Sequence, residues 1–86
     1  MVSEITLTLI GKPGCHLCED AEAVVTTVVT SLPELPISVE EKNIEEDKDL
    51  FDSYWDQIPV LLINGKVHNY WRIDPVRLTK ALEELS

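Results

Sequence analysis

Cys15 and Cys18 are the two cysteines of this chain, and two residues separate them. Chance would produce that spacing in only a few per cent of cases, roughly, so it calls for a chemical explanation. Residues three apart are neighbours on a helix surface, and a Cα separation of about 5–6 Å suits a disulfide. The pair is therefore expected to close and open a disulfide without large movement of the backbone.

The local sequence predicts different roles for the two thiols. Cys15 is expected at a helix start, where unpaired N–H groups and the helix dipole favour a thiolate. Lys12 and a protonated His16 would add positive charge, whereas acidic neighbours such as Glu19 oppose it. Cys18 would lie one turn inside the helix and be more shielded. We therefore predict that Cys15 attacks a disulfide and that Cys18 resolves the resulting mixed disulfide.

Other uses of a cysteine pair remain open. A structural disulfide would close a loop too short to restrain the unfolded chain much. A zinc site or a cluster shared by two chains needs about four ligands. This chain offers the two thiols and His16, with His68 distant in sequence. We predict a redox pair without metal ligands. The alternatives are an iron–sulfur or zinc binding module and an adaptor whose cysteines are inert.

The composition limits the class of protein. A chain of 86 residues is expected to form one domain over residues 1–86. Its net charge of −9 disfavours nucleic acid and anionic membranes as partners. No apolar run approaches the length of a membrane span, and Met1 to Glu4 carries no basic leader. We expect a cytoplasmic monomer.

The first half of the chain reads as a strand, a helix and a second strand. Glu4–Ile10 alternates and is β-branched, and Gly11–Gly14 is rich in turn residues. An amphipathic helix is expected from Cys15 until Pro33, followed by a strand within Ile37–Ile44. The apolar face of this helix comprises Leu17, Ala21, Val24, Val25, Val28, Val29 and Leu32.

The second half reads as a helix, a hairpin and a final helix. A helix over Glu45–Trp55 precedes an apolar strand, Pro59–Ile63, which is expected to be buried on both faces. Asn64-Gly65 is typical of a two-residue hairpin turn that leads into the strand Lys66–Trp71. Asp74-Pro75 suits the start of the last helix. Apolar stripes are expected at Leu50, Phe51, Tyr54 and Trp55 and at Leu78, Ala81, Leu82 and Leu85.

The order βαβαββα predicts an α/β fold. Its first two strands should be parallel, and the hairpin should add antiparallel strands to the same sheet. We expect a four-stranded mixed sheet flanked by helices.

Three segments carry a family resemblance: Lys12–Cys18, Ile58–Leu61 and the Asn64-Gly65 hairpin. With the order of elements, they resemble the glutaredoxins of the thioredoxin fold, most closely short glutaredoxin-like proteins with a Gly-Cys-His-Leu-Cys motif. The resemblance covers nearly the whole chain.

The resemblance also implies residue roles. Pro59 would be a cis-proline facing the cysteine pair, and the backbone of Ile58 would pair with a bound peptide or glutathione. Lys12 would meet a substrate carboxylate. Asp74 would match an acidic glutathione-binding residue, although the Gly-Gly pair that precedes it in most glutaredoxins is replaced by bulky residues, including Trp71.

The implied function is reduction of protein or low-molecular-weight disulfides, in cellular electron transport and redox homeostasis. Glutathione or a flavoprotein reductase would supply electrons, and no tightly bound cofactor is expected.

Several residues have a second interpretation. His16 could tune Cys15 or simply be solvated, and His68 is expected to be an ordinary surface or partly buried histidine. The aromatic residues Tyr54, Trp55, Tyr70 and Trp71 could line a substrate groove, but we expect them to pack in the core.

Overall fold

The computed structural model describes residues 4–85, so the expectation about Met1 to Glu4 falls largely outside this range. The elements follow the predicted order βαβαββα, with one extra short 3₁₀ helix. They are β1 (Ile5–Gly11), α1 (His16–Ser31), β2 (Ile37–Asn43), the 3₁₀ helix (Ile44–Glu46), α2 (Lys48–Tyr54), β3 (Val60–Ile63), β4 (Lys66–Tyr70) and α3 (Pro75–Leu85).

One four-stranded mixed sheet forms the centre of the fold. Its strand order is β2-β1-β3-β4, with β1 and β2 parallel and the other pairs antiparallel. The central strand β1 pairs Leu9 with Glu41 of β2 on one side and with Leu61 of β3 on the other. The predicted sheet is therefore confirmed, and the end of its central strand leads directly toward Cys15.

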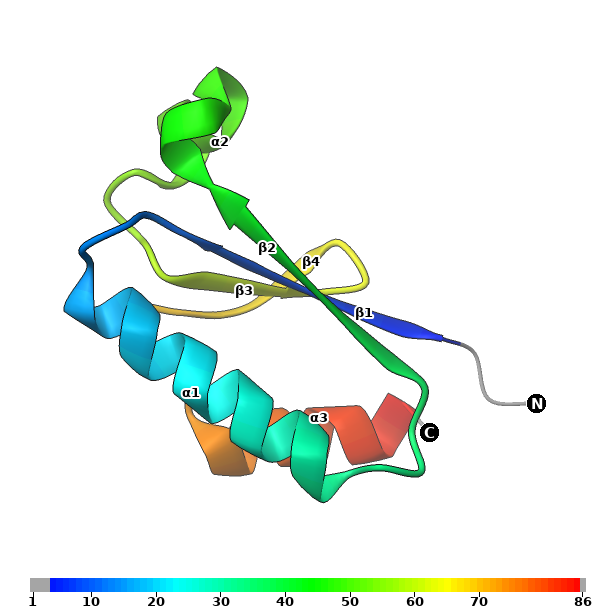
Figure 1. Ribbon diagram of the computed structural model, residues 1–86. Coiled ribbons are helices and arrows are strands. Elements are labelled where there is room, and N and C mark those ends of the chain that lie inside the picture. Colours follow the sequence, from blue (N-terminus) through cyan, green and yellow to red (C-terminus); the bar gives the residue numbers. More distant parts are fainter. Residues whose placement is uncertain (1–3, 86) are drawn as a thin grey trace.

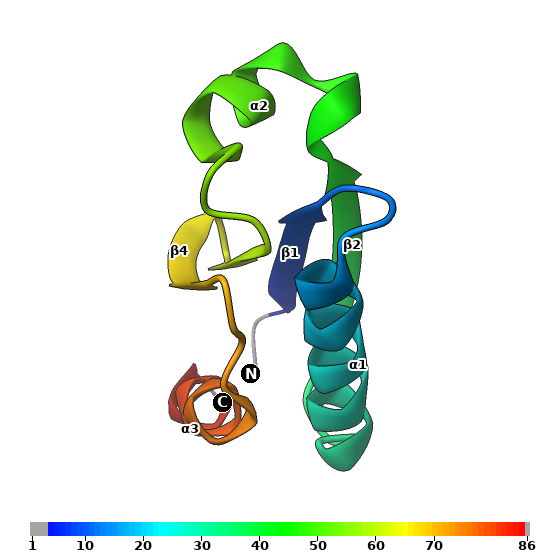
Figure 2. The same ribbon diagram turned by 90° about the vertical axis from the view of Figure 1, so that its left-hand side faces the viewer.

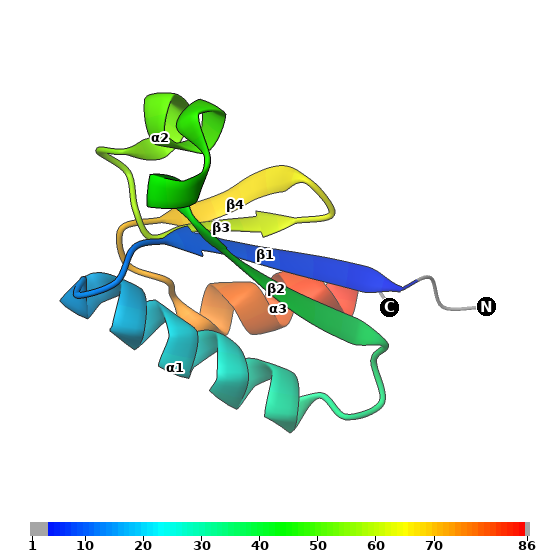
Figure 3. The ribbon, with the colours of Figure 1, turned by 45° about the horizontal axis from the view of Figure 1, so that its top comes forward.

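The helices cover the sheet unequally. Helices α1 and α3 lie side by side against one face, whereas α2 lies on the opposite side, near the end of β2 (Figures 1, 2 and 3). The core between the sheet and the α1–α3 layer is the larger one. Its buried residues are Ile5, Leu7, Leu9, Ala21, Val25, Val28, Leu61, Ile73, Leu78 and Leu82.

A smaller apolar cluster holds α2 on the other face. Ile10, Ile44 and Val60 are buried there, and Leu50 and Tyr54 of α2 pack against them. The predicted helix Glu45–Trp55 is split in two. The break is at Asp47, whose backbone is extended and whose carboxylate accepts hydrogen bonds from two backbone N–H groups at the start of α2.

Several predicted apolar faces were too wide. Phe51 and Trp55 of the α2 region and Leu85 of α3 are exposed, because neither helix is covered on its outer side. Leu17 is exposed because it lies in the first turn of α1, beyond the main core. Strand β3 is fully buried only at Val60 and Leu61, so the prediction of burial on both faces holds for half of the strand.

The predicted Asn64-Gly65 hairpin turn is confirmed. Both residues have positive φ angles, 51° and 85°, which is the backbone of the type I′ turn that matches strand twist. Asn64 also joins the hairpin to β1, since its side-chain oxygen accepts a hydrogen bond from Thr6 N–H at 2.9 Å. Its own N–H donates to the Thr6 carbonyl at 2.8 Å.

None of the helices within residues 4–85 is both long enough and apolar enough to span a membrane.

Candidate active site

The first cysteine forms the N-cap of α1. Gly14, at φ 78°, turns the chain so that Cys15 takes an extended backbone just before the helix. The Cys15 sulfur accepts a hydrogen bond from the Cys18 N–H at 3.3 Å, and its carbonyl accepts one from Glu19 N–H at 3.1 Å. Serine, threonine, aspartate or asparagine usually fills this position. The Cys15 sulfur serves the same purpose here, because it accepts the Cys18 N–H at the start of the helix.

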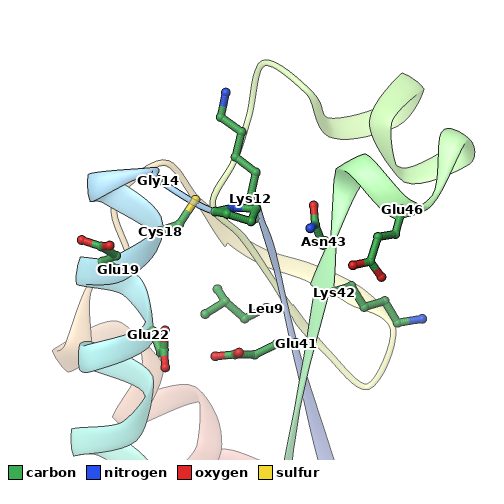
Figure 4. A pocket seen from close by; sticks show the side chains of 12 residues that line it. Leu9, Lys12, Gly14, Cys18, Glu19, Glu22, Glu41, Lys42, Asn43 and Glu46 are labelled. Carbon is green, nitrogen blue, oxygen red and sulfur yellow. The ribbon is translucent and has the colours of Figure 1, made fainter.

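The second cysteine has different surroundings. The Cys18 sulfur points from α1 toward the end of β1 and the backbone at Lys12 (Figure 4). Burial, together with a hydrogen bond with Cys15, raises the pKa of the Cys18 thiol to about 11. The backbone N–H and the charge of Lys12 act in the opposite direction. This shift favours the protonated form of Cys18 at neutral pH.

Both cysteines are free and half-buried, one helical turn apart. The predicted placement at the helix start is thus confirmed. The predicted roles of attacking and resolving thiol remain predictions.

The two basic residues of the motif, His16 and Lys12, lie at different places. The His16 side chain is 97% exposed, with Nδ1 3.7 Å from the Glu19 carboxylate. The Lys12 side chain leads away from the cysteines toward solvent (Figure 4), although its backbone N–H reaches the Cys18 sulfur. Both side chains are in reach of an approaching ligand, and the substrate-binding roles expected for them stay predictions.

A pocket of about 460 Å³ lies between the start of α1 and the end of β2, and Cys18 is on its wall. We call it the acidic pocket, because Glu19, Glu22, Glu41 and Glu46 line it together with Lys12 and Lys42. Glu41 on β2 points toward α1, where Glu22 lies (Figure 4). The pocket is therefore a polar, mostly anionic space next to the more shielded thiol, Cys18.

A second pocket, of about 210 Å³, lies on another side of the α1 start. We call it the aromatic pocket; Leu17, Asp20, Ala21, Val24, Trp71, Arg72 and Ile73 line it. Trp71 has a positive φ of 64°, its indole N–H donates to the Asp56 carbonyl at 2.9 Å, and its ring meets Tyr70 edge-on at 5.1 Å.

This second pocket corrects the expectation for the aromatic residues. Trp55, Tyr70 and Trp71 are exposed rather than packed in the core, and Tyr54 alone joins an apolar cluster. The chain turns out of the sheet after Tyr70, which carries Trp71 to the surface. The placement of Leu17 and Trp71 on the wall of one pocket was missed. Its signal was the position of Leu17 between the two cysteines.

The remaining predicted site residues lie around this end of the sheet. The Ile58–Pro59 peptide bond is cis, as the resemblance implied. Pro59 lies one residue beyond the Val60–Ile10 pair, at the end of the sheet that leads to the cysteines. Its carbonyl accepts a hydrogen bond from Trp71 N–H at 2.8 Å. Ile58 packs on the smaller apolar cluster.

Asp74 has a structural partner. Its carboxylate accepts hydrogen bonds from the N–H groups of Val76 and Arg77 at the start of α3, at 2.9 and 3.3 Å. It therefore caps α3, as predicted from Asp74-Pro75. The substrate-binding role that the resemblance implies would have to share this carboxylate with the helix.

Within residues 4–85, no group of three or more histidine, cysteine, aspartate or glutamate side chains is arranged to hold a metal ion.

The sheet order, the covering helices and a cysteine pair at the start of α1 define a thioredoxin-fold protein. Mitochondrial thioredoxin 3 of Saccharomyces cerevisiae has the same fold, with a TM-score of 0.67 and 15% identity; the match covers 94% of this chain and 78% of that one.

The family follows from closer matches. The model of the glutaredoxin-like domain (DUF836) matches residues 6–83, and the chain belongs to this glutaredoxin-like family. A glutaredoxin-like protein of Dictyostelium discoideum is 31% identical over 84 residues, which cover 94% of this chain and 78% of the relative. The solution structure of protein Ne2328 from Nitrosomonas europaea has a TM-score of 0.77 and 26% identity, over 95% of both chains.

Proposed function

We propose that this protein is a dithiol thiol–disulfide oxidoreductase. The observation that carries the proposal is the contrast within the cysteine pair: Cys15 caps a helix and accepts an N–H hydrogen bond, whereas Cys18 is a shielded thiol whose pKa burial raises to about 11. At neutral pH such a pair has one favoured nucleophile. The second thiol stays protonated until a mixed disulfide has formed beside it.

The proposed reaction has two steps. The Cys15 thiolate attacks one sulfur of a substrate disulfide, which breaks the substrate S–S bond, releases one substrate thiolate and joins the other to Cys15. Cys18 then loses its proton to solvent and attacks the Cys15 sulfur. The second substrate thiolate leaves, and a Cys15–Cys18 disulfide remains. Two electrons have then passed from the protein to the substrate.

A reductant must restore the two thiols. We propose glutathione or a flavoprotein reductase as the electron donor and protein or low-molecular-weight disulfides as substrates. The exposed Leu17 and Trp71 support a protein substrate, since aromatic and apolar side chains are favoured at binding surfaces. A reducing compartment such as the cytosol suits the reaction, because thiols are kept reduced there. One chain carries both cysteines, so we propose that the monomer is sufficient.

The test is glutathione-dependent reduction of a small mixed disulfide, coupled to glutathione reductase and NADPH. The wild type should turn over, and Cys15→Ser should lose activity at least 100-fold. Cys18→Ser should retain part of it, since one thiol can exchange with glutathione. Separate alkylation of the thiols shows that they are free.

Three outcomes carry different meanings. A silent wild type with freely alkylated thiols would exclude glutathione as donor, and the same assay with a flavoprotein reductase and a protein disulfide would then decide the proposal. Turnover by Cys15→Ser would exclude Cys15 as the nucleophile. Inactivity with both donors would overturn the proposed function.

A further inference from the structure

Gly11, the last residue of β1, lies directly against the second cysteine. A Cβ atom at this position would be 2.8 Å from the Cys18 sulfur and 3.1 Å from the Cys18 Cβ. Real Cβ atoms essentially never come within 3.0 Å of another atom, so something would have to shift. The space that a side chain at Gly11 would fill is therefore already occupied by Cys18.

This glycine differs from the other two in the chain. Gly14 and Gly65 have positive φ angles and open space around them, so their role is conformational. Gly11 continues a regular strand and pairs with Asn43 of β2, a conformation that any residue adopts. What position 11 requires is the absence of a side chain.

The residue after Gly11, Lys12, also contacts the Cys18 sulfur through its backbone. The backbone N–H of Lys12 donates to this sulfur and lowers the Cys18 pKa, against the effect of burial. Lys12 directly follows Gly11 in the chain, so two adjacent residues supply the N–H donor and the space for the sulfur. A methyl group at position 11 would push the sulfur away from this donor.

We propose that Gly11 is a positioning residue for the resolving step. This inference rests on the proposed function. Its missing side chain keeps the Cys18 sulfur against the Lys12 N–H and one helical turn from Cys15. Moving the sulfur weakens the N–H contact that favours its thiolate, so resolution slows while the first attack by Cys15 continues. The shorter of the two contacts is with the sulfur, which can rotate away, whereas the 3.1 Å contact with the Cys18 Cβ requires a small shift of the helix or strand.

Reaction with the aromatic disulfide DTNB separates the two steps. The Cys15 thiolate attacks DTNB, which releases one thionitrobenzoate ion and leaves the other joined to Cys15. Cys18 loses its proton to solvent and attacks the Cys15 sulfur, which releases the second ion and forms the Cys15–Cys18 disulfide. The protein loses two electrons, and one DTNB becomes two thionitrobenzoate ions. Stopped-flow absorbance follows both phases.

The variant to compare is Gly11→Ala. We expect the first phase to stay within twofold of the wild type and the second to slow at least tenfold. Ile10→Val is the matched control, because it removes a methyl group from the neighbouring residue of β1, which faces the smaller apolar cluster. It should leave the second phase within twofold. Equal rates in Gly11→Ala and the wild type, or equal slowing of both phases, would overturn the proposal.

Stability gives a second test that does not depend on the reaction. If Gly11→Ala loses stability, adding Cys18→Ala should restore most of it, because the 2.8 Å contact with the sulfur is gone and only the 3.1 Å contact with the Cβ remains. An equal loss of stability with and without the Cys18 sulfur would contradict the inference. Failure of the proposed function looks different: with one equivalent of DTNB, the wild type itself would then form no Cys15–Cys18 disulfide.

Discussion

The acidic pocket and the aromatic pocket both border the start of α1, yet they differ in almost every property. The acidic pocket holds the Cys18 sulfur among carboxylates and has a volume of about 460 Å³. The aromatic pocket is half that size and is bordered by Leu17 and Trp71. A protonated thiol and water-accessible charges suit proton and thiol exchange, whereas an exposed indole and a leucine suit contact with a partner. The start of α1 therefore separates a polar, charged pocket from one with exposed apolar side chains.

The largest expected effect comes from removing the core residue of the aromatic pocket. Ile73 is 6% exposed and joins the main apolar core. Ile73→Ala should lower the free energy of unfolding by about 2–3 kcal/mol, through lost burial and the cavity left behind. Urea unfolding measures it. Glu22→Ala in the acidic pocket is the control and should change stability by less than about 0.5 kcal/mol. Similar losses of unfolding free energy in both variants would show that the two pockets contribute equally to stability.

Trp71 allows a sharper test of the aromatic pocket. Its φ of 64° suits glycine better than any residue with a Cβ. Trp71→Ala and Trp71→Gly lose the same indole contacts, but the glycine variant relieves the backbone and should be more stable by about 1 kcal/mol. It also restores a glycine where most glutaredoxins have one, so glutathione-dependent turnover should rise several-fold in Trp71→Gly alone.

The two Trp71 variants also test recognition. Reduction of a protein disulfide should fall several-fold in both, because the exposed ring is gone. Unchanged kinetics with a protein substrate would show that this pocket takes no part in partner binding.

A substitution at Lys12 tests how charge in the acidic pocket affects the Cys18 thiol. Its charge lowers the Cys18 pKa, so Lys12→Met should raise that pKa above the present value of about 11. Release of the second thionitrobenzoate ion requires the Cys18 thiolate, and its pH profile should therefore shift to higher pH, with a rate a few-fold lower at neutral pH. Lys42→Met is the matched control, because Lys42 lines the same pocket but its amine is paired with Glu40 at 3.8 Å. Identical shifts in both variants would show that the overall charge of the pocket, and not the position of Lys12, sets the Cys18 pKa.

The smallest expected effect lies away from both pockets, at His68. Burial lowers the pKa of this imidazole, and the positive charge of Arg77 lowers it further. The folded state therefore favours neutral His68, whereas the unfolded chain binds a proton near pH 6.5. The contribution of neutral His68 to the free energy of unfolding should be fully present above that pH and should fall as the pH drops below it. Urea unfolding at several pH values should show a weaker dependence in His68→Gln. An unchanged profile would mean that other groups cause any loss in acid.

The sequence was most informative where local pattern and tertiary contact agree. The alternation in β1, the Asn64-Gly65 turn and the Asp74 cap each depend on a few neighbouring residues, and each formed as predicted. The position of the cysteines at a helix start was predictable for the same reason. Burial in a small domain was less predictable, because an apolar residue such as Phe51 or Trp55 remains exposed when nothing covers its helix.

The contacts between distant segments could not be read from the sequence. Nothing in the pattern indicated that Trp71 would leave the sheet and line a pocket together with Leu17, since that depends on where β4 ends. The contact between Gly11 and Cys18 was hidden for a similar reason. Gly11 was assigned to the turn-rich loop, yet it completes β1, and only the packing of α1 on the sheet brings the Cys18 sulfur to it.

The position of β2 at the edge of the sheet also affects how the protein behaves in concentrated solution. An edge strand offers unpaired backbone groups to a second chain and can start edge-to-edge aggregation. β2 carries Glu40, Glu41 and Lys42 on its exposed positions, within a chain of net charge −9. Like charge keeps two such edges apart. This protection weakens as salt screens the charges or as acid neutralises the carboxylates. The acidic residues that border the cysteine pair therefore also help to keep the protein dispersed.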